Sequence, residues 1–132
     1  MTTLNIPFIA DLAAIRHDLH AHPELAFKET RTSEVVTREL NSYGLTVHRG
    51  LAGTGVVGVL RKGSSRRAIG LRADMDALPL QEKGECPHRS RNEGRMHACG
   101  HDGHTTMLLG AARYLAEHRD VVAEPDLQLR LR

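Results

Sequence analysis

The sequence contains no tryptophan, and phenylalanine and tyrosine together make up only 3% of its 132 residues. A hydrophobic core must therefore consist mainly of aliphatic side chains. No window approaches the roughly 18 apolar residues that a membrane-spanning helix needs. Residues 1–10 contain no lysine or arginine, whereas a signal peptide begins with a basic segment. These absences argue against membrane insertion and export, and we expect a cytoplasmic protein.

The sequence also has few cysteines and a small net charge. The two cysteines, Cys86 and Cys99, are expected to remain reduced because no export signal precedes them. The 18 basic residues exceed the 16 acidic ones by two, which is too small a surplus to indicate a nucleic-acid partner. Histidine, in contrast, occurs nine times. Because histidine is a frequent metal ligand and proton carrier, its abundance points to a functional site.

Three segments have the periodicity of helices. Apolar residues recur at steps of three and four from Ile9 to Leu19, and this helix should end near His22, which precedes a proline. A second helix is expected from about Thr30 to Gly44, where glycine suits the C-terminal cap. A third is expected around residues 108–119, with its apolar residues on one face.

Strand patterns lie between and after these helices. Residues 55–60 and 68–73 are two β-branched runs, and the polar segment 61–67 between them predicts a hairpin. Residues 81–97 have no period and predict a long loop. Leucines alternate with polar residues over 127–131, which predicts a strand at one edge of the sheet. The mixture predicts the α/β class, a sheet covered by helices.

Residues 96–105 hold the densest group of potential metal ligands, five within eight residues. Cys99 and His101 are two positions apart, so an extended backbone would place both side chains on the same side. A thiolate and an imidazole that converge in this way suit zinc or another borderline divalent metal. His97 has the same parity and is a further candidate for this face.

Each of these residues also has a purely structural interpretation. Asp102 is placed to act as a helix N-cap, and His104 to face solvent in the first helical turn. Cys99 is of a type that often packs as a small buried hydrophobe. The density of the group favours ligation by the Cys99 and His101 pair, whereas spacing alone favours structural roles for His97, Asp102 and His104.

Two carboxylates, Asp74 and Asp76, follow the predicted strand at 68–73. Sites in α/β sheets lie beyond the carboxyl ends of strands, and two acids of the same parity suit the holding or orienting of a metal. An Asp-rich turn before Pro79 is the alternative.

A third group consists of His17, His20 and His22, at the end of the first predicted helix. Imidazoles at this position interact favourably with the helix dipole. We therefore expect a structural role for this group rather than metal ligation.

Three segments stand out together: Arg-His-Asp-Leu-His-Ala-His-Pro-Glu-Leu-Ala-Phe at 16–27, Leu-Arg-Ala-Asp-Met-Asp-Ala-Leu-Pro at 71–79 and Met-His-Ala-Cys-Gly-His-Asp-Gly-His-Thr at 96–105. Together they resemble a known family, the metal-dependent amidohydrolases. The resemblance is to the hippurate hydrolase and N-acyl-amino-acid hydrolase group, related to dinuclear-metal carboxypeptidases. It covers about residues 9–120, and the third segment is the most specific.

The resemblance implies an αβα metallo-aminopeptidase-like catalytic domain, with a lid domain inserted later in the chain. It implies cleavage of the amide bond of N-acyl amino acids by water that two divalent metals activate, often manganese, zinc or nickel. Cys99 and His101 match metal ligands of the family. Asp74 matches the catalytic-site acid that orients a metal-binding side chain, and Arg72 stands where more distant relatives have a histidine ligand.

Residues 121–132 depart from the family pattern. The family's general base is the first glutamate of a Glu-Glu pair after Gln-Pro-Ala, and Glu124 before Pro125 does not replace it. We therefore expect residues 1–132 to be a partial catalytic domain, shortened by a frameshift or premature stop, without the lid and inactive alone. Whether the chain is itself an enzyme is left open, and the alternative is a non-catalytic metal-binding fragment or partner protein.

Overall fold

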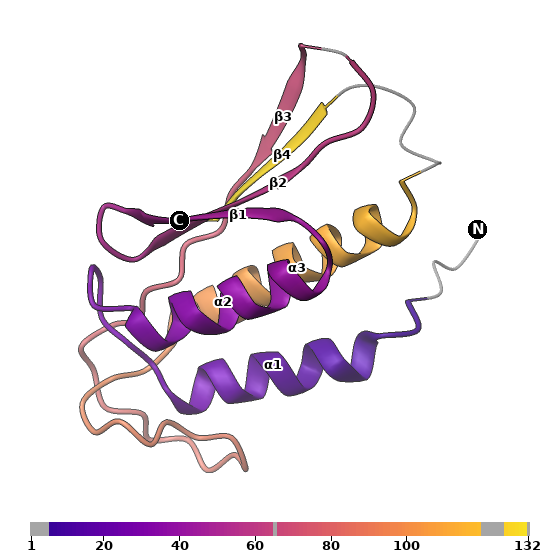
Figure 1. The fold of residues 1–132 in the computed structure, drawn as a ribbon. Coiled ribbons are helices and arrows are strands. Elements are labelled where there is room, and N and C mark those ends of the chain that lie inside the picture. The colour runs from indigo at the N-terminus through magenta and orange to yellow at the C-terminus, as the bar shows by residue number, and fades with distance from the viewer. Residues whose placement is uncertain (1–5, 65, 120–125, 132) are drawn as a thin grey trace.

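The computed structural model describes residues 6–64, 66–119 and 126–131, which form three helices and a four-stranded sheet (Figure 1). The strands are arranged in the order β1-β2-β4-β3. The elements follow the order α1 (Ile9–Ala21), α2 (Thr30–Ser42), β1 (Thr46–Leu51), β2 (Gly55–Leu60), β3 (Ala68–Leu71), α3 (His101–Glu117) and β4 (Asp126–Leu131).

The helices lie on one side of the sheet (Figure 1). Helix α2 packs against β1 and β2, and α3 contacts both α2 and β4. Helix α1 packs on α3, farther from the sheet. No helix in the described ranges has the length and apolar character needed to cross a membrane.

The predicted ends of the first two helices are confirmed. Helix α1 ends at Ala21, directly before the His22-Pro23 pair. Gly44 follows α2 with a φ of +78°, a left-handed conformation that glycine adopts without strain. The start of α2 is held by Glu24, whose carboxylate accepts the backbone N–H groups of Arg31 and Thr32 at 3.1 and 2.8 Å. A carboxylate at this position also compensates the positive end of the helix dipole.

The predicted hairpin between residues 55–60 and 68–73 is wrong. Strand β4 lies between β2 and β3, antiparallel to the first and parallel to the second. The backbone hydrogen bonds that a hairpin would have formed are made to β4 instead, and β2 forms its hairpin with β1. The predicted strand at 127–131 is confirmed as β4, but it lies inside the sheet rather than at its edge.

The core is aliphatic, as the scarcity of aromatic residues predicts. Its central members come from α2, β2 and α3, and four are fully buried: Val36, Leu40, Val56 and Leu109. Helices α1 and α3 approach closely at Gly110, where a Cβ atom would lie 2.7 Å from Leu12 Cδ1. A glycine in the middle of α3 therefore sets the distance between these helices.

We expect the Leu109→Ala substitution to lower the free energy of unfolding by about 2–5 kcal/mol, because it removes a fully buried side chain and leaves a cavity. Met107→Ala is the matched control, since Met107 lies on the same helix with 64% of its surface exposed. Urea denaturation of both variants measures the difference. Equal losses in the two variants would contradict the assignment of Leu109 to the core.

Candidate functional site

The segments that carry the predicted site residues lie side by side. Leu78 and Met96 exchange two backbone hydrogen bonds of 3.0 and 3.1 Å. The N–H of Ala77 donates to the carbonyl of Glu24 at 2.7 Å. These bonds bring the aspartate segment after β3 against the histidine and cysteine segment before α3, although about 20 residues of loop separate them.

The imidazole of His101, the first residue of α3, contacts Asp76. Its Nδ1 lies 2.9 Å from the backbone oxygen of Asp76 and 2.9 Å from carboxylate Oδ1. Because both acceptors meet the same nitrogen, Nδ1 carries a proton, and Nε2 faces neither of these acceptors. A carboxylate behind an imidazole in this way is the usual partner of a histidine metal ligand.

Asp74 is placed differently. Its carboxylate pairs with Arg72 at 2.7 Å and is 47% exposed, and its backbone oxygen accepts the Thr105 hydroxyl at 3.1 Å. The carboxylate that contacts His101 is therefore that of Asp76. The catalytic role that the resemblance gives to Asp74 stays a prediction.

The extended backbone expected between Cys99 and His101 is not formed. Cys99 lies in a turn, and Gly100 has a φ of +77° as the N-cap of α3. The left-handed glycine turns the chain directly into the helix, so the argument from strand parity does not apply. Cys99 is exposed rather than packed as a buried hydrophobe, which leaves its thiol accessible.

The structural roles expected for Asp102 and His104 have opposite outcomes. The predicted N-cap role of Asp102 is wrong, because Gly100 is the cap and Asp102 is the second residue of α3, fully buried. His104 is exposed in the first turn of the helix, as its structural interpretation predicts.

A groove of about 310 Å³ lies beside Asp76. Its lining combines charged residues with an aromatic ring, and it includes Phe27, Arg72, Asp74 and Asp76. Phe27 has a φ of +63°, which is rare for a residue with a bulky side chain, and 75% of its surface is exposed. Backbone strain at an exposed aromatic residue in a groove is typical of functional sites.

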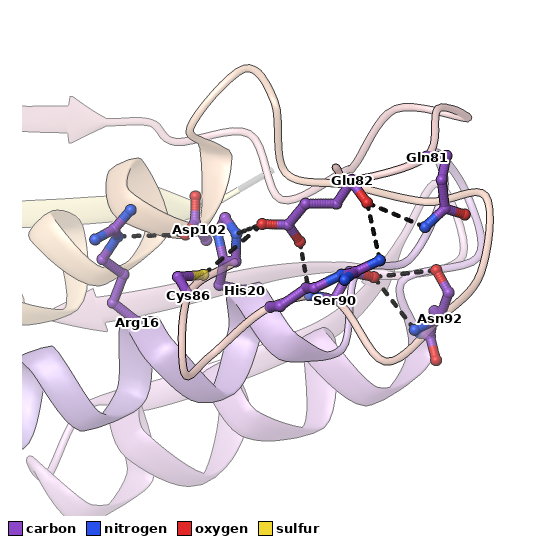
Figure 2. Close-up of polar contacts among 9 residues, drawn as sticks. Arg16, His20, Gln81, Glu82, Cys86, Ser90, Asn92 and Asp102 are labelled. Carbon is purple, nitrogen blue, oxygen red and sulfur yellow. Dashed lines mark hydrogen bonds and ion pairs between the residues drawn. The ribbon is translucent and has the colours of Figure 1, made fainter. Parts of the chain in front are cut away.

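A buried polar cluster joins α1, α3 and the loop, and sequence patterns did not indicate it (Figure 2). The ring of His20 lies between two carboxylates: Nδ1 is 2.8 Å from Asp102 Oδ2, and Nε2 is 3.2 Å from Glu82 Oε1. Arg16 also reaches Asp102, with Nε 3.3 Å from Oδ2. His20 therefore has specific partners in addition to its place in the last turn of the helix. No periodicity marks Glu82, because it lies in the irregular loop.

The loop holds Glu82 in a fixed orientation. The N–H of Ser90 donates to Oε2 at 2.6 Å, and the Cys86 thiol lies 3.8 Å from Oε1. Burial opposes ionisation of this carboxylate, but the hydrogen bonds from Ser90 and His20 outweigh burial and lower the pKa of Glu82. The cluster therefore contains an ionised, buried carboxylate.

The ring of His97 lies near that of His20, with centroids 6.3 Å apart, and His97 is only 4% exposed. Neither of its ring nitrogens has a hydrogen-bond partner within the described ranges. Burial lowers the pKa of His97, more than the nearby carboxylate of Asp102 raises it. The ring is consequently a neutral imidazole in the interior.

Comparisons with known proteins support the family resemblance that the segments 16–27, 71–79 and 96–105 indicate. Residues 70–131 match the model of Peptidase family M20/M25/M40. The chain is 56% identical over 115 residues to a hippurate hydrolase of Campylobacter jejuni, covering 84% of this chain and 30% of the relative. It is 46% identical over 110 residues to an N-acyl-L-amino acid amidohydrolase of Geobacillus stearothermophilus, covering 83% of this chain and 30% of the relative.

The fold also matches that of a solved structure from the same family. A dinuclear metal binding peptidase of the M20 family from Bacillus subtilis superposes with a TM-score of 0.89 at 34% identity, over 97% of this chain and 36% of that structure. The resemblance to the metal-dependent amidohydrolases is therefore confirmed, as is the α/β fold of their catalytic domain. The chain spans less than a third of the length of the two curated relatives above.

We expect Glu82→Gln to lower the free energy of unfolding by about 3 kcal/mol at neutral pH, because it removes one partner of the buried His20–Glu82 pair. The folded pKa of Glu82 is lowered, so its contribution is present above about pH 4.3 and is lost as the pH falls through the folded value. The difference between wild type and variant should therefore shrink in acid.

Chemical denaturation at a series of pH values measures this difference. Glu85→Gln is the control, since Glu85 lies on the same loop with an exposed side chain, and it should change stability by less than about 0.5 kcal/mol. If the difference in free energy of unfolding between wild type and Glu82→Gln stays constant down to pH 2, the Glu82 carboxylate is not the source of that difference.

Proposed function

We propose that residues 1–132 form part of the catalytic domain of a metal-dependent amidohydrolase that cleaves N-acyl amino acids such as hippurate. The observation that carries the proposal is the contact between His101 Nδ1 and Asp76, which leaves Nε2 of His101 available to a metal, with the exposed Cys99 two residues earlier in the chain. Two relatives are named as hydrolases of hippurate and of N-acyl amino acids, and these names support the substrate class.

The donor chemistry fits a divalent metal. Cys99 offers a thiolate and His101 an imidazole with its second nitrogen fixed by a carboxylate, a set that zinc and other borderline divalent metals accept. Two donors do not complete a metal site, so further ligands have to come from other residues. We propose that the site binds a pair of manganese, zinc or nickel ions. When bound, such ions supply an activated water and polarise the amide carbonyl.

The chain's own residues have three roles in this proposal. Cys99 and His101 bind the metal, and Asp76 holds the His101 ring in the tautomer that exposes Nε2. The groove next to Asp76 receives the substrate, with the ring of Phe27 placed against an apolar acyl group and Arg72 near its charged end. The family's general base is the first glutamate of a Glu-Glu pair, which these 132 residues do not contain, so we propose that they do not turn over substrate by themselves.

A chimera tests the activity. Residues 6–119 replace the matching segment of the Campylobacter hippurate hydrolase, and benzoate release from hippurate is measured with manganese added. We expect release by the chimera, none above the metal blank by the 132-residue chain, and a loss of at least about a hundredfold on Cys99→Ala in the chimera. A folded, metal-loaded chimera that cleaves neither hippurate nor other N-acyl amino acids would refute the proposal.

Metal binding distinguishes the two aspartates. We expect Asp76→Asn to weaken metal binding by about 10–100-fold, because the carboxylate behind a ligating imidazole orients the ring and raises its basicity. Asp74→Asn is the matched control, since its carboxylate pairs with Arg72. The metal titration is followed at the ring nitrogens of His101 by NMR. A larger loss in Asp74→Asn would give the orienting role to Asp74, as the sequence resemblance does.

A further inference from the structure

We propose that His20, Glu82 and Cys86 form a separate binding site for zinc or a similar divalent cation, here called the loop cation site. The three potential ligand atoms, His20 Nε2, Glu82 Oε1 and Cys86 Sγ, lie within 4.8 Å of one another (Figure 2). They form the one group of three or more such donors in the described ranges. None of its three donors is a proposed ligand of the catalytic metal.

Two of the three donor spacings are close to those of tetrahedral coordination. With zinc bonds of about 2.0–2.1 Å to nitrogen or oxygen and about 2.3 Å to sulfur, neighbouring ligand atoms lie about 3.3 Å apart for N and O and about 3.6 Å for S and O. The distances here are 3.2 Å from His20 Nε2 to Glu82 Oε1 and 3.8 Å from Cys86 Sγ to the same oxygen. The third pair, His20 Nε2 and Cys86 Sγ, lies within 4.8 Å, so these two side chains have to draw together to bind an ion.

The contacts of His20 call for a positive charge at this position. Asp102 accepts from Nδ1 at 2.8 Å, so that nitrogen carries a proton. Nε2 then presents a lone pair to the carboxylate of Glu82 at 3.2 Å, and two acceptors cannot face each other without a positive charge between them. That charge is either a second proton on the ring or a metal ion.

The surroundings of the donors favour the metal ion. Asp102 stands behind His20 as the carboxylate partner that ligating imidazoles usually have, and Arg16 balances its charge. The Ser90 N–H occupies Oε2 of Glu82, which leaves Oε1 for the ion. Cys86 is half-buried and so remains partly open to solvent, to which its thiol proton passes when the ion binds.

Three protein ligands leave one tetrahedral position for water. Since His20 belongs to α1 whereas Glu82 and Cys86 belong to the loop, an ion here would fasten the loop to the helix. The same loop leads into Cys99 and His101. The loop cation site would therefore act as a structural clamp near the proposed catalytic metal.

The test uses cobalt as a spectroscopic probe in the 132-residue chain carrying Cys99→Ala, where Cys86 is the one remaining thiol. We expect one equivalent of cobalt to produce a thiolate-to-cobalt charge-transfer band, which zinc displaces. Adding Cys86→Ser should abolish the band and weaken zinc binding at least about tenfold. Circular dichroism of both chains checks that they are folded.

Two results would overturn the proposal: no charge-transfer band in the folded Cys99→Ala chain, or unchanged zinc affinity after Cys86→Ser. A second measurement needs no substitution at the site itself. In the Cys99→Ala chain, the NMR resonance of His20 Nε2 should shift on zinc addition, and an unchanged resonance would show that a proton, not a metal, occupies the cluster. The chimera experiment reports on the hydrolase function separately, because it depends on Cys99.

Discussion

The position of the candidate site depends on one imidazole held between two buried carboxylates. His20 fixes Asp102 on one side and Glu82 on the other, and so connects α1, the first turn of α3 and the loop between β3 and α3. Asp102 directly follows His101, and successive residues of an α-helix point about 100° apart. When Asp102 is turned towards His20, His101 is turned towards Asp76. The buried contact thus determines which way the proposed metal ligand faces.

Local signals were sufficient for much of the fold. The apolar period from Ile9 to Leu19, the proline after His22 and the glycine at position 44 predicted two helices with nearly the observed ends. Alternating leucines likewise predicted β4. These features depend on neighbours in the chain, which a sequence displays directly.

Non-local pairing was not visible in the same way. Nothing in residues 55–60 or 68–71 shows that a strand more than 50 residues later separates them. At the site, the motif identified Cys99, His101 and the aspartate pair, but it did not show which aspartate meets His101. That choice follows from the backbone of residues 96–101, where the left-handed Gly100 replaces the expected extended segment. Glu82 was missed because its role comes from contacts made across the fold.

The place of β4 inside the sheet has a consequence for folding kinetics. Strand β3 lies at the sheet's edge and pairs with β4, so residues 68–71 gain their hydrogen-bonded neighbour only after residues 126–131 have been synthesised. The β1–β2 hairpin and the three helices precede β4 in the chain and involve more local contacts. Because long-range strand pairing is slow, the aspartate segment after β3 should be among the last of the described residues to become ordered during folding.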